Sequence, residues 1–537
     1  MNDQPSNSSQ RALSRIIMVV GWVVILGIGL TIYGLAIKPR LSGKLIEQTS
    51  SQIRYDHQIR LAHDSFSGYA ILRSPAVQNL LKKKSIKITF IDDKADYSQR
   101  LNKLKNGKVQ MAVFTIDAYI KASSKTGTFP AAVVLVIDET KGADAIVAYQ
   151  KGVPEISRLS TPSASIMLVP DSPSETLARV MINKFSLPSL PNNWLKPAND
   201  PESVYKMLKS TKPSEQKAFV LWEPYVSQAL SLDNVHVLLD SSKLKGYIVD
   251  VLVAERRFLN QNPDQVQAIV EAYLRARYDY AQQPDGLVNL LVEDSKKYGQ
   301  ALKLDEAKSL VSGIEWRNTM ENYAHFGVVS KTEANNSELL DDMIAKIVNV
   351  LDKTDAIQDD PLEGNFGQIY YDGILRSLYS DNFHPSISNS ELEDIDLGGG
   401  EATALPKVRA QKQLVALGQS DWQKLKPVAT MKVRPIQFGR GNARIQRNSQ
   451  RSLVALANDL KSFPHWYIKV IGHTRSEGNR KANQDLAQQR ADETAKFLMK
   501  NGISNSRIQA LAVGQPPANA TGGQAQSVTF MLLEKPY

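Results

Sequence analysis

From residue 59 onward, short apolar runs alternate with longer amphipathic stretches, and this alternation limits the fold more than any other feature of the chain. The apolar runs predict strands at residues 59–63, 86–91, 109–114, 131–137, 145–149 and 165–169. A helix is predicted to follow the loop 64–68 and to run to about residue 81, and helical spacing of apolar residues predicts further helices at 97–106, 263–280, 287–298, 304–314 and 339–351. A chain that alternates in this way is expected to form an α/β fold, with an open sheet of buried parallel strands and right-handed crossovers.

The length of 537 residues is too great for one core and predicts about three units. Asn, Ser, Glu, Asp and Gly gather between residues 388 and 406, which is typical of a linker. Beyond it, strands at 436–438, 467–471, 508–513 and 527–533 and helices at 449–462 and 484–500 predict a second, smaller α/β unit. The expected divisions are a tail 1–15, an anchor 16–37, a stalk 38–57, a large domain 58–385, a linker 386–430 and a small domain 431–537.

Residues 16–37 carry no charged side chain and are apolar on every side of a helix. Such a helix would be about 33 Å long, which matches the hydrocarbon core of a bilayer at about 30 Å. The run is long for the core of a signal peptide, and 35–38 make a poor cleavage site. We therefore expect one uncleaved transmembrane helix. Basic residues flank the run almost equally on both sides, so their charge does not set its orientation.

The composition speaks against several classes of function. There is no cysteine, the seven histidines are scattered, and no Gly-x-Ser-x-Gly or phosphate-binding glycine loop occurs. We therefore expect no metal, no cofactor and no enzymatic activity. The net charge of +10 is spread along the chain without a zinc-finger or RNA-binding signature, so we expect no nucleic-acid partner.

A short set of motifs marks the C-terminal unit: Gly472-His473-Thr474, Gly478, Asn483, Leu486 and Gln489-Arg490-Ala491. With these motifs the unit resembles the OmpA-like peptidoglycan-binding domain. The resemblance implies a site for the zwitterionic diaminopimelate of the cell wall, in which an aspartate takes the ammonium and an arginine takes the carboxylate. The candidate peptidoglycan-binding residues are Thr474, Arg475, Asn483 and Arg490.

One of these positions departs from the family pattern, because Arg475 stands where the aspartate is expected. An arginine cannot accept a hydrogen bond from an ammonium group. Three interpretations stay open: Glu477 or Asp485 supplies the anion, the site prefers a doubly anionic ligand, or the fold persists without wall binding. Outside the motif, Arg490 would be read as a surface arginine paired with Glu493.

Three segments mark the large domain: 134–138, 142–148 and the Val220-Leu221-Trp222-Glu223-Pro224-Tyr225-Val226 box. With them the domain resembles the periplasmic solute-binding proteins of the nitrate, sulfonate and taurine group, which serve ABC importers. The resemblance implies two α/β lobes that close on a small solute, at a cleft where helix N-termini are ready anion sites. The candidate solute-binding residues are Ser65, Ser67, Thr115, Asp138, Thr140, Ser172, Ser174 and Trp222.

The identity of the solute stays open at this point. Hydroxyl groups and helix N-termini favour an anion, whereas Glu223 next to Trp222 counts against one. Ser172 or Ser174 is as well explained as a helix cap, and Trp222 as a core residue.

Together these features predict an envelope protein with a two-lobed solute-binding domain, an OmpA-like domain and one N-terminal transmembrane helix. We expect it in the bacterial inner membrane, crossing once, with its C-terminal bulk in the periplasm. Its expected partners are peptidoglycan, a small solute, the membrane and an ABC importer. The alternative is a structural linker or docking scaffold whose solute pocket is degenerate.

Overall fold

The computed structural model describes residues 55–299, 301–330, 332–335, 337–386, 405–409, 414–473, 478–513 and 528–536. By its internal contacts the chain divides into two units, 1–57 and 58–537. The expected tail 1–15, the anchor 16–37 and most of the stalk 38–57 lie outside the described residues.

The expected place in the inner membrane is corrected by the structure. Within the described ranges no helix has both the length and the apolar character needed to cross a bilayer. The two longest helices, α11 (Pro263–Gln282) and α20 (Arg480–Lys500), carry charged side chains along their length. The run 16–37, on which the prediction rested, is not among the described residues.

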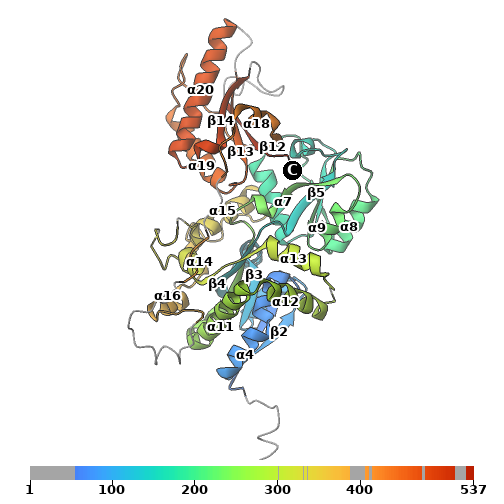
Figure 1. Ribbon diagram of the computed structural model, residues 1–537, viewed down its shortest axis with the longest axis vertical. Coiled ribbons are helices and arrows are strands. Elements are labelled where there is room, and N and C mark those ends of the chain that lie inside the picture. The colour runs from blue at the N-terminus through green and yellow to red at the C-terminus, as the bar shows by residue number, and fades with distance from the viewer. Residues whose placement is uncertain are drawn as a thin grey trace, which may run out of the picture. The chain divides into compact units, whose positions relative to one another are not determined.

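The first lobe is built on a six-stranded sheet with the order β11-β4-β10-β3-β1-β2 (Figure 1). Its strands are β1 (His57–His63), β2 (Ile86–Asp92), β3 (Met111–Thr115), β4 (Ala131–Thr140), β10 (Val249–Glu255) and β11 (Ile314–Trp316). β3 pairs in parallel with β1, as expected, but antiparallel with β10, which also pairs antiparallel with β4. The sheet is therefore mixed, because a strand from far along the chain is inserted between two early ones.

The second lobe is built on a five-stranded sheet with the order β7-β6-β8-β5-β9. Its strands are β5 (Asp144–Tyr149), β6 (Ser165–Leu168), β7 (Leu195–Pro197), β8 (Lys217–Trp222) and β9 (Val235–Asp240). The chain enters this lobe from β4 through residues 141–143 and returns from β9 to β10 through 241–248. These two crossings join the lobes at the ends of strands from both sheets.

Helices cover both sheets. Those of the first lobe are α3 (Ala70–Arg73), α4 (Pro75–Lys83), α5 (Tyr97–Lys105), α6 (Ile116–Thr126), α10 (Arg256–Gln261), α11, α12 (Pro284–Lys297), α13 (Leu304–Gly313), α14 (Thr319–His325) and α16 (Gly373–Ser380). Those of the second lobe are α7 (Pro173–Lys184), α8 (Pro201–Ser210) and α9 (Tyr225–Leu230). The expected helix up to residue 81 is broken before Pro75, where Ser74 caps α4 by accepting a hydrogen bond from the Val77 amide.

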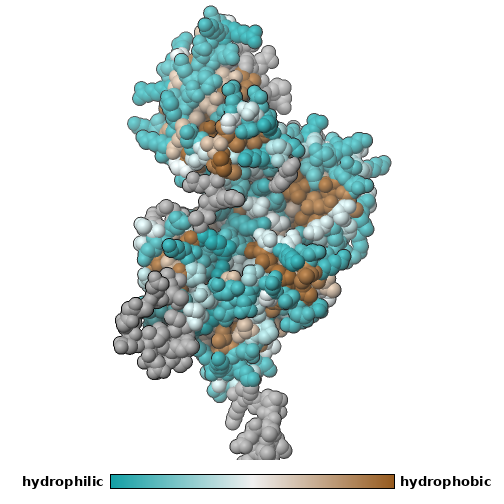
Figure 2. All heavy atoms as spheres, viewed as in Figure 1, coloured by the Kyte–Doolittle hydropathy of each residue, from teal (hydrophilic) through white to brown (hydrophobic). Residues whose placement is uncertain are grey.

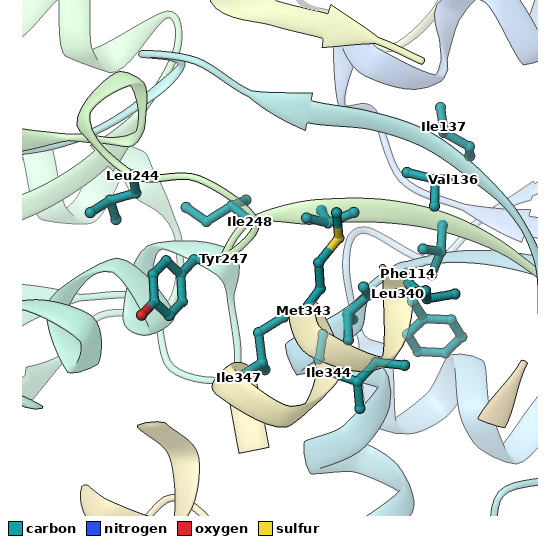
Figure 3. Close-up of a cluster of buried hydrophobic side chains, with 14 of the residues drawn as sticks. Phe114, Val136, Ile137, Leu244, Tyr247, Ile248, Leu340, Met343, Ile344 and Ile347 are labelled. Atoms are coloured by element: carbon teal, nitrogen blue, oxygen red, sulfur yellow. The ribbon is translucent and has the colours of Figure 1, made fainter. Parts of the chain in front are cut away.

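An apolar cluster lies beneath the crossings between the lobes (Figure 3). Helix α15 (Leu340–Lys353) contributes the fully buried Leu340, Met343, Ile344 and Ile347, and the second crossing contributes Tyr247 and Ile248. α15 packs against α6 of the first lobe and α7 of the second. On the face shown in Figure 2 most of the surface is hydrophilic, with apolar residues gathered over the second lobe near β5 and α9.

The C-terminal unit has a four-stranded sheet with the order β12-β15-β13-β14. Its elements are α18 (Gln419–Lys424), β12 (Lys426–Thr430), α19 (Arg447–Lys461), β13 (Tyr467–His473), α20, β14 (Ile508–Val513) and β15 (Val528–Glu534). β12 precedes the expected domain start at 431 and pairs with β15. The expected strand 436–438 is reduced to a single bridge between Phe438 and Ile445.

Candidate functional sites

A cavity of about 330 Å³ lies between the two lobes. The loop after β1 and the end of β3 line it from the first lobe. The start of β5, the start of α7 and the end of β8 line it from the second. Strand ends and helix starts meet here because the chain crosses between the lobes at this place.

Six of the eight predicted solute-binding residues line this cavity: Ser65, Ser67, Thr115, Thr140, Ser172 and Trp222. Ser172 stands at the N-cap position of α7, but its hydroxyl donates to the carbonyl oxygen of Val169 at 2.6 Å instead of capping the helix. Trp222 is half-buried at the end of β8. Their role in binding stays a prediction.

The other two predicted residues are buried beside the cavity. Ser174 has no exposed surface, and its hydroxyl donates to Oδ1 of Asp144 at 3.5 Å. Asp138 is also fully buried and lies directly opposite Asp250 on the neighbouring strand. Ser174 and Asp138 therefore lie next to residues that line the cavity, Asp144 and Asp250, and do not face its interior themselves.

Sequence reasoning noted Glu223 but missed Asp144 and Asp250, the two most buried acidic residues of the cavity wall. The sequence contained a signal for both, because each is an acidic residue directly before an apolar run, in β5 and β10 respectively. A charge in a buried strand needs a partner or a function. Tyr69, also missed, donates its hydroxyl hydrogen to Oδ1 of Asp250.

Burial is the main cause of the raised pKa values of these acidic residues. It raises the pKa of Asp144 to about 7, and the nearby carboxyl of Asp117 adds to the increase. Burial also raises the pKa of Asp250 well above its usual range, and Asp138 reinforces that shift. Glu223, at the end of the Trp222 strand, has a raised pKa for the same reason. The cavity therefore holds carboxyl groups that are costly to ionise without a countercharge.

Two buried arginines behind the cavity have their charges already matched. Arg73 donates from Nε to Oδ2 of Asp294 at 3.1 Å. Arg100 donates to Oδ2 of Asp93 at 2.8 Å and to Oδ2 of Asp64 at 2.9 Å. These pairs hold the loop after β1 in place. Across the described ranges, no group of His, Cys, Asp and Glu side chains is arranged to hold a metal ion.

The second candidate site lies at the end of β13 in the C-terminal unit. A Cβ atom on Gly472 would lie 2.2 Å from the carbonyl oxygen of Ala487, so α20 can approach the strand only because this residue is glycine. Gly478 adopts a φ of +90°, and Asn479 caps α20 by accepting from the Ala482 amide at 3.0 Å. The predicted residues Thr474 and Arg475, and also Glu477, lie outside the described residues.

Arg490 projects from α20 into the C-terminal unit and is 8% exposed. Its Nε donates to the carbonyl oxygen of Asn442 at 3.2 Å, and its guanidinium lies 5.0 Å from the centre of the Phe438 ring. Glu493 pairs with Lys496 at 3.0 Å. The arrangement differs from that of a surface arginine paired with Glu493 and suits an arginine held in a fixed orientation. Asn483 is half-buried near the start of the same helix.

Arg507, which directly precedes β14, is buried and stabilises the fold of this unit. Its guanidinium donates to the carbonyl oxygens of Trp466 at 3.0 Å, Leu460 at 3.3 Å and Phe463 at 2.6 Å. It thereby ties the end of α19 to the loop that leads into β13.

Residues 437–528 match the family model described as the OmpA family. The C-terminal unit is an OmpA domain. It is 36% identical over 84 residues to the probable lipoprotein YiaD of Escherichia coli, which is 16% of this chain and 37% of that protein. It is 36% identical over 86 residues to the peptidoglycan-associated lipoprotein of Legionella pneumophila, 15% of this chain and 49% of that protein. This chain thus spans less than half the length of either relative.

The region before the OmpA domain is similar to solved periplasmic binding proteins. The aliphatic sulphonate binding protein SsuA of Escherichia coli aligns with a TM-score of 0.43 and 16% identity, over 57% of this chain and 91% of that one. SsuA of Xanthomonas axonopodis pv. citri, solved with bound MOPS, aligns with a TM-score of 0.42 and 14% identity, over 57% of this chain and 97% of that one.

Proposed function

We propose that this chain is a cell-envelope protein that binds a small solute between the lobes of its large domain and attaches to peptidoglycan through its OmpA domain. No step in this function requires chemistry on the solute. The two activities belong to separate sheets and use separate residues.

The cavity between the lobes carries the first half of the proposal. Its volume suits a small molecule, and residues of both lobes line it, so a bound molecule would contact both. Six hydroxyl-bearing or aromatic residues expected at a solute site lie on its wall. The neighbouring crossings are short, and such joints can absorb a hinge motion on binding.

The second half rests on Arg490 and on the names of the relatives. A buried guanidinium, oriented by a backbone carbonyl and an aromatic ring, can bind a carboxylate in a bidentate manner. One matched relative is a peptidoglycan-associated lipoprotein. The wall peptide offers such a carboxylate in its diaminopimelate, as the family resemblance implies.

Sedimentation with purified sacculi tests wall attachment of the full chain. We expect the chain to pellet with sacculi and Arg490→Lys to weaken retention about tenfold, because lysine keeps the charge but loses the planar fork. Arg451→Lys, an exposed arginine of α19, is the matched control and should retain normally.

The variant Arg475→Asp examines the departure from the family pattern. It restores an acceptor for the ammonium group and should increase retention. If neither the natural chain nor Arg475→Asp pellets, wall attachment is wrong. If only Arg475→Asp pellets, the natural site does not take this ligand and the proposal also fails.

A further inference from the structure

The walls of the cavity between the lobes are strongly acidic. Five acidic side chains line it: Asp64, Asp92, Asp144, Glu223 and Asp250. Among the described residues, Lys94 is the one basic side chain on the wall, and it is exposed together with Asp92. Asp138 adds a further carboxyl group just behind Asp250. Carboxyl groups that are costly to ionise alone become easier to ionise beside a cation, so this wall suits a cation and offers little to an anion.

The protein supplies no countercharge for the innermost acids. Asp64 pairs with Arg100, but Asp144, Glu223 and Asp250 make no ion pair within the part of the chain that the structure describes. Buried carboxyl groups without a cation are unfavourable. They are retained here at the wall of a cavity, where a cation from outside can reach them.

Fully buried polar atoms at the same wall point to a ligand independently. Thr115 and Thr140 line the cavity, and their buried hydroxyl oxygens make no hydrogen bond of acceptable geometry, although each lies near a carboxyl group, that of Asp117 and that of Asp144 respectively. Asp138 does not line the cavity, and its carboxyl group lies within hydrogen-bond reach of the Asp250 carboxyl. Native interiors leave few such atoms unsatisfied, and a bound molecule with N–H groups would satisfy them.

The helix N-termini at the cavity are already occupied by resident acids. Asp117 lies in the first turn of α6 and accepts a hydrogen bond from Thr176. Asp144 accepts from Ser174 in the first turn of α7. Carboxyl groups of the protein itself therefore lie at the N-terminus of α6 and beside that of α7, where they disfavour a bound anion.

Aromatic rings complete the wall. Phe66, Tyr69 and Trp222 line the cavity together with Tyr97 and Tyr298. The last two already have an arginine guanidinium 4.8 Å from the ring centre, on Arg100 and Arg73 respectively. Tyr97 and Tyr298 therefore already make cation–π contacts with the protein's own arginines. The other rings on the wall suit a ligand with a positive charge and an apolar body.

We infer that the solute of the proposed binding function is a small organic cation bearing a protonated amine, held by Asp144 from the second lobe and Asp250 from the first. This inference rests on the proposed solute-binding function and names the class of its ligand. A cationic solute differs from the anionic one that the hydroxyl groups and helix N-termini favoured in the sequence analysis.

Isothermal titration calorimetry on the full chain at low ionic strength tests it. The probes are the protonated amines putrescine and spermidine, the anions ethanesulfonate and phosphate, and neutral 1,4-butanediol, which matches putrescine in length without its charges. We expect at least one cation to bind and the anions and the diol not to bind. Asp144→Asn and Asp250→Asn should each weaken binding of that cation by at least about tenfold, since each removes a charged partner.

Asp359→Asn removes the same charge from an exposed position outside the cavity and should leave the affinity unchanged. Unfolding curves of each variant show whether a loss of binding reflects a loss of fold. Cation binding that survives both cavity substitutions would overturn the assignment to this site. If only an anion binds, the inference of a cationic ligand is wrong, but the proposed solute-binding function stands. If no probe binds, both the cationic ligand and the solute-binding function are wrong.

Discussion

At the scale of single residues, Asp144 is a cavity carboxyl group whose ionisation is unfavourable in the folded protein. The hydroxyls of Thr140 and Ser174 and the carboxyls of Asp117 and Glu223 face it, and burial raises its pKa to about 7. An unfolded chain would leave this aspartate near its usual value of 3.8. The folded protein therefore binds a proton here that the unfolded chain has already lost.

This difference makes stability depend on pH. Between pH 4 and 7 the folded state holds more protons than the unfolded state, so Asp144 lowers stability as pH rises and its full cost is present above pH 7. We expect Asp144→Asn to raise the free energy of unfolding by about 2 to 4 kcal/mol at pH 8 and to change it little at pH 4. Urea unfolding at both pH values measures this.

Asp359→Asn is the control and should show no such pH dependence, because that residue is exposed. An equal effect of Asp144→Asn at pH 4 and pH 8 would contradict the raised pKa. A protein that keeps such a residue at a cost to stability is consistent with a binding role for it.

At the scale of elements, the contact between β13 and α20 positions the residues of the proposed wall site. Gly472 in β13 allows the backbone of α20 to come close at Ala487, and α20 in turn carries Asn483 and Arg490. The motif Gly-x-Thr therefore reflects helix packing as well as ligand chemistry. Its glycine is needed for the space that a side chain would fill.

Gly472→Ala should loosen this contact, since the added methyl would overlap a backbone carbonyl that cannot simply rotate away. We expect a local loss of about 2 kcal/mol, which corresponds to roughly thirtyfold faster hydrogen exchange in peptides from α20. Hydrogen exchange read by mass spectrometry localises the effect to that helix.

Gly286→Ala provides the comparison, because a Cβ atom there meets nothing closer than 3.4 Å. In the Gly286→Ala variant, the backbone amides of its helix, α12, should exchange hydrogen at the same rate as in the natural chain or slightly more slowly. Unchanged exchange in α20 of the Gly472→Ala variant would show that the helix can shift to accept the methyl group.

At the scale of the whole molecule, the chain combines two sites that share no residue. The cavity is formed by the sheets of the two lobes, and Arg490 belongs to the sheet and helices of the OmpA domain. Substitutions at sites without shared partners usually act independently. If binding at one site changed the affinity of the other, binding at the second site would change the affinity of the first by the same factor.

We therefore expect Asp144→Asn to leave retention on sacculi within twofold of the natural chain, and Arg490→Lys to leave cation affinity within twofold. Calorimetry and sedimentation on the same preparations measure both quantities. A variant of one site that changes the other by tenfold would show that the domains communicate, and then the reverse variant must do so by the same factor.

The sequence predicted the elements well where the signal is local. β1, β2, α5 and α12 lie within a few residues of their expected bounds, since apolar periodicity depends on near neighbours. The same holds for the OmpA domain, whose motif is contained in one stretch of chain. The break at Pro75 in the first expected helix could also have been read from the sequence.

What the sequence alone determined is thus the order of the elements, the two-lobed and OmpA-like resemblances and six residues of the cavity wall, because each depends on residues close together in the chain. Only the tertiary structure decided that β10 lies between β3 and β4, and that the cavity is acidic. Asp144 and Asp250 are distant in sequence, and only folding brings them to one cavity and removes them from water. Burial and pairing are properties of long-range contacts, which short patterns in a chain do not record.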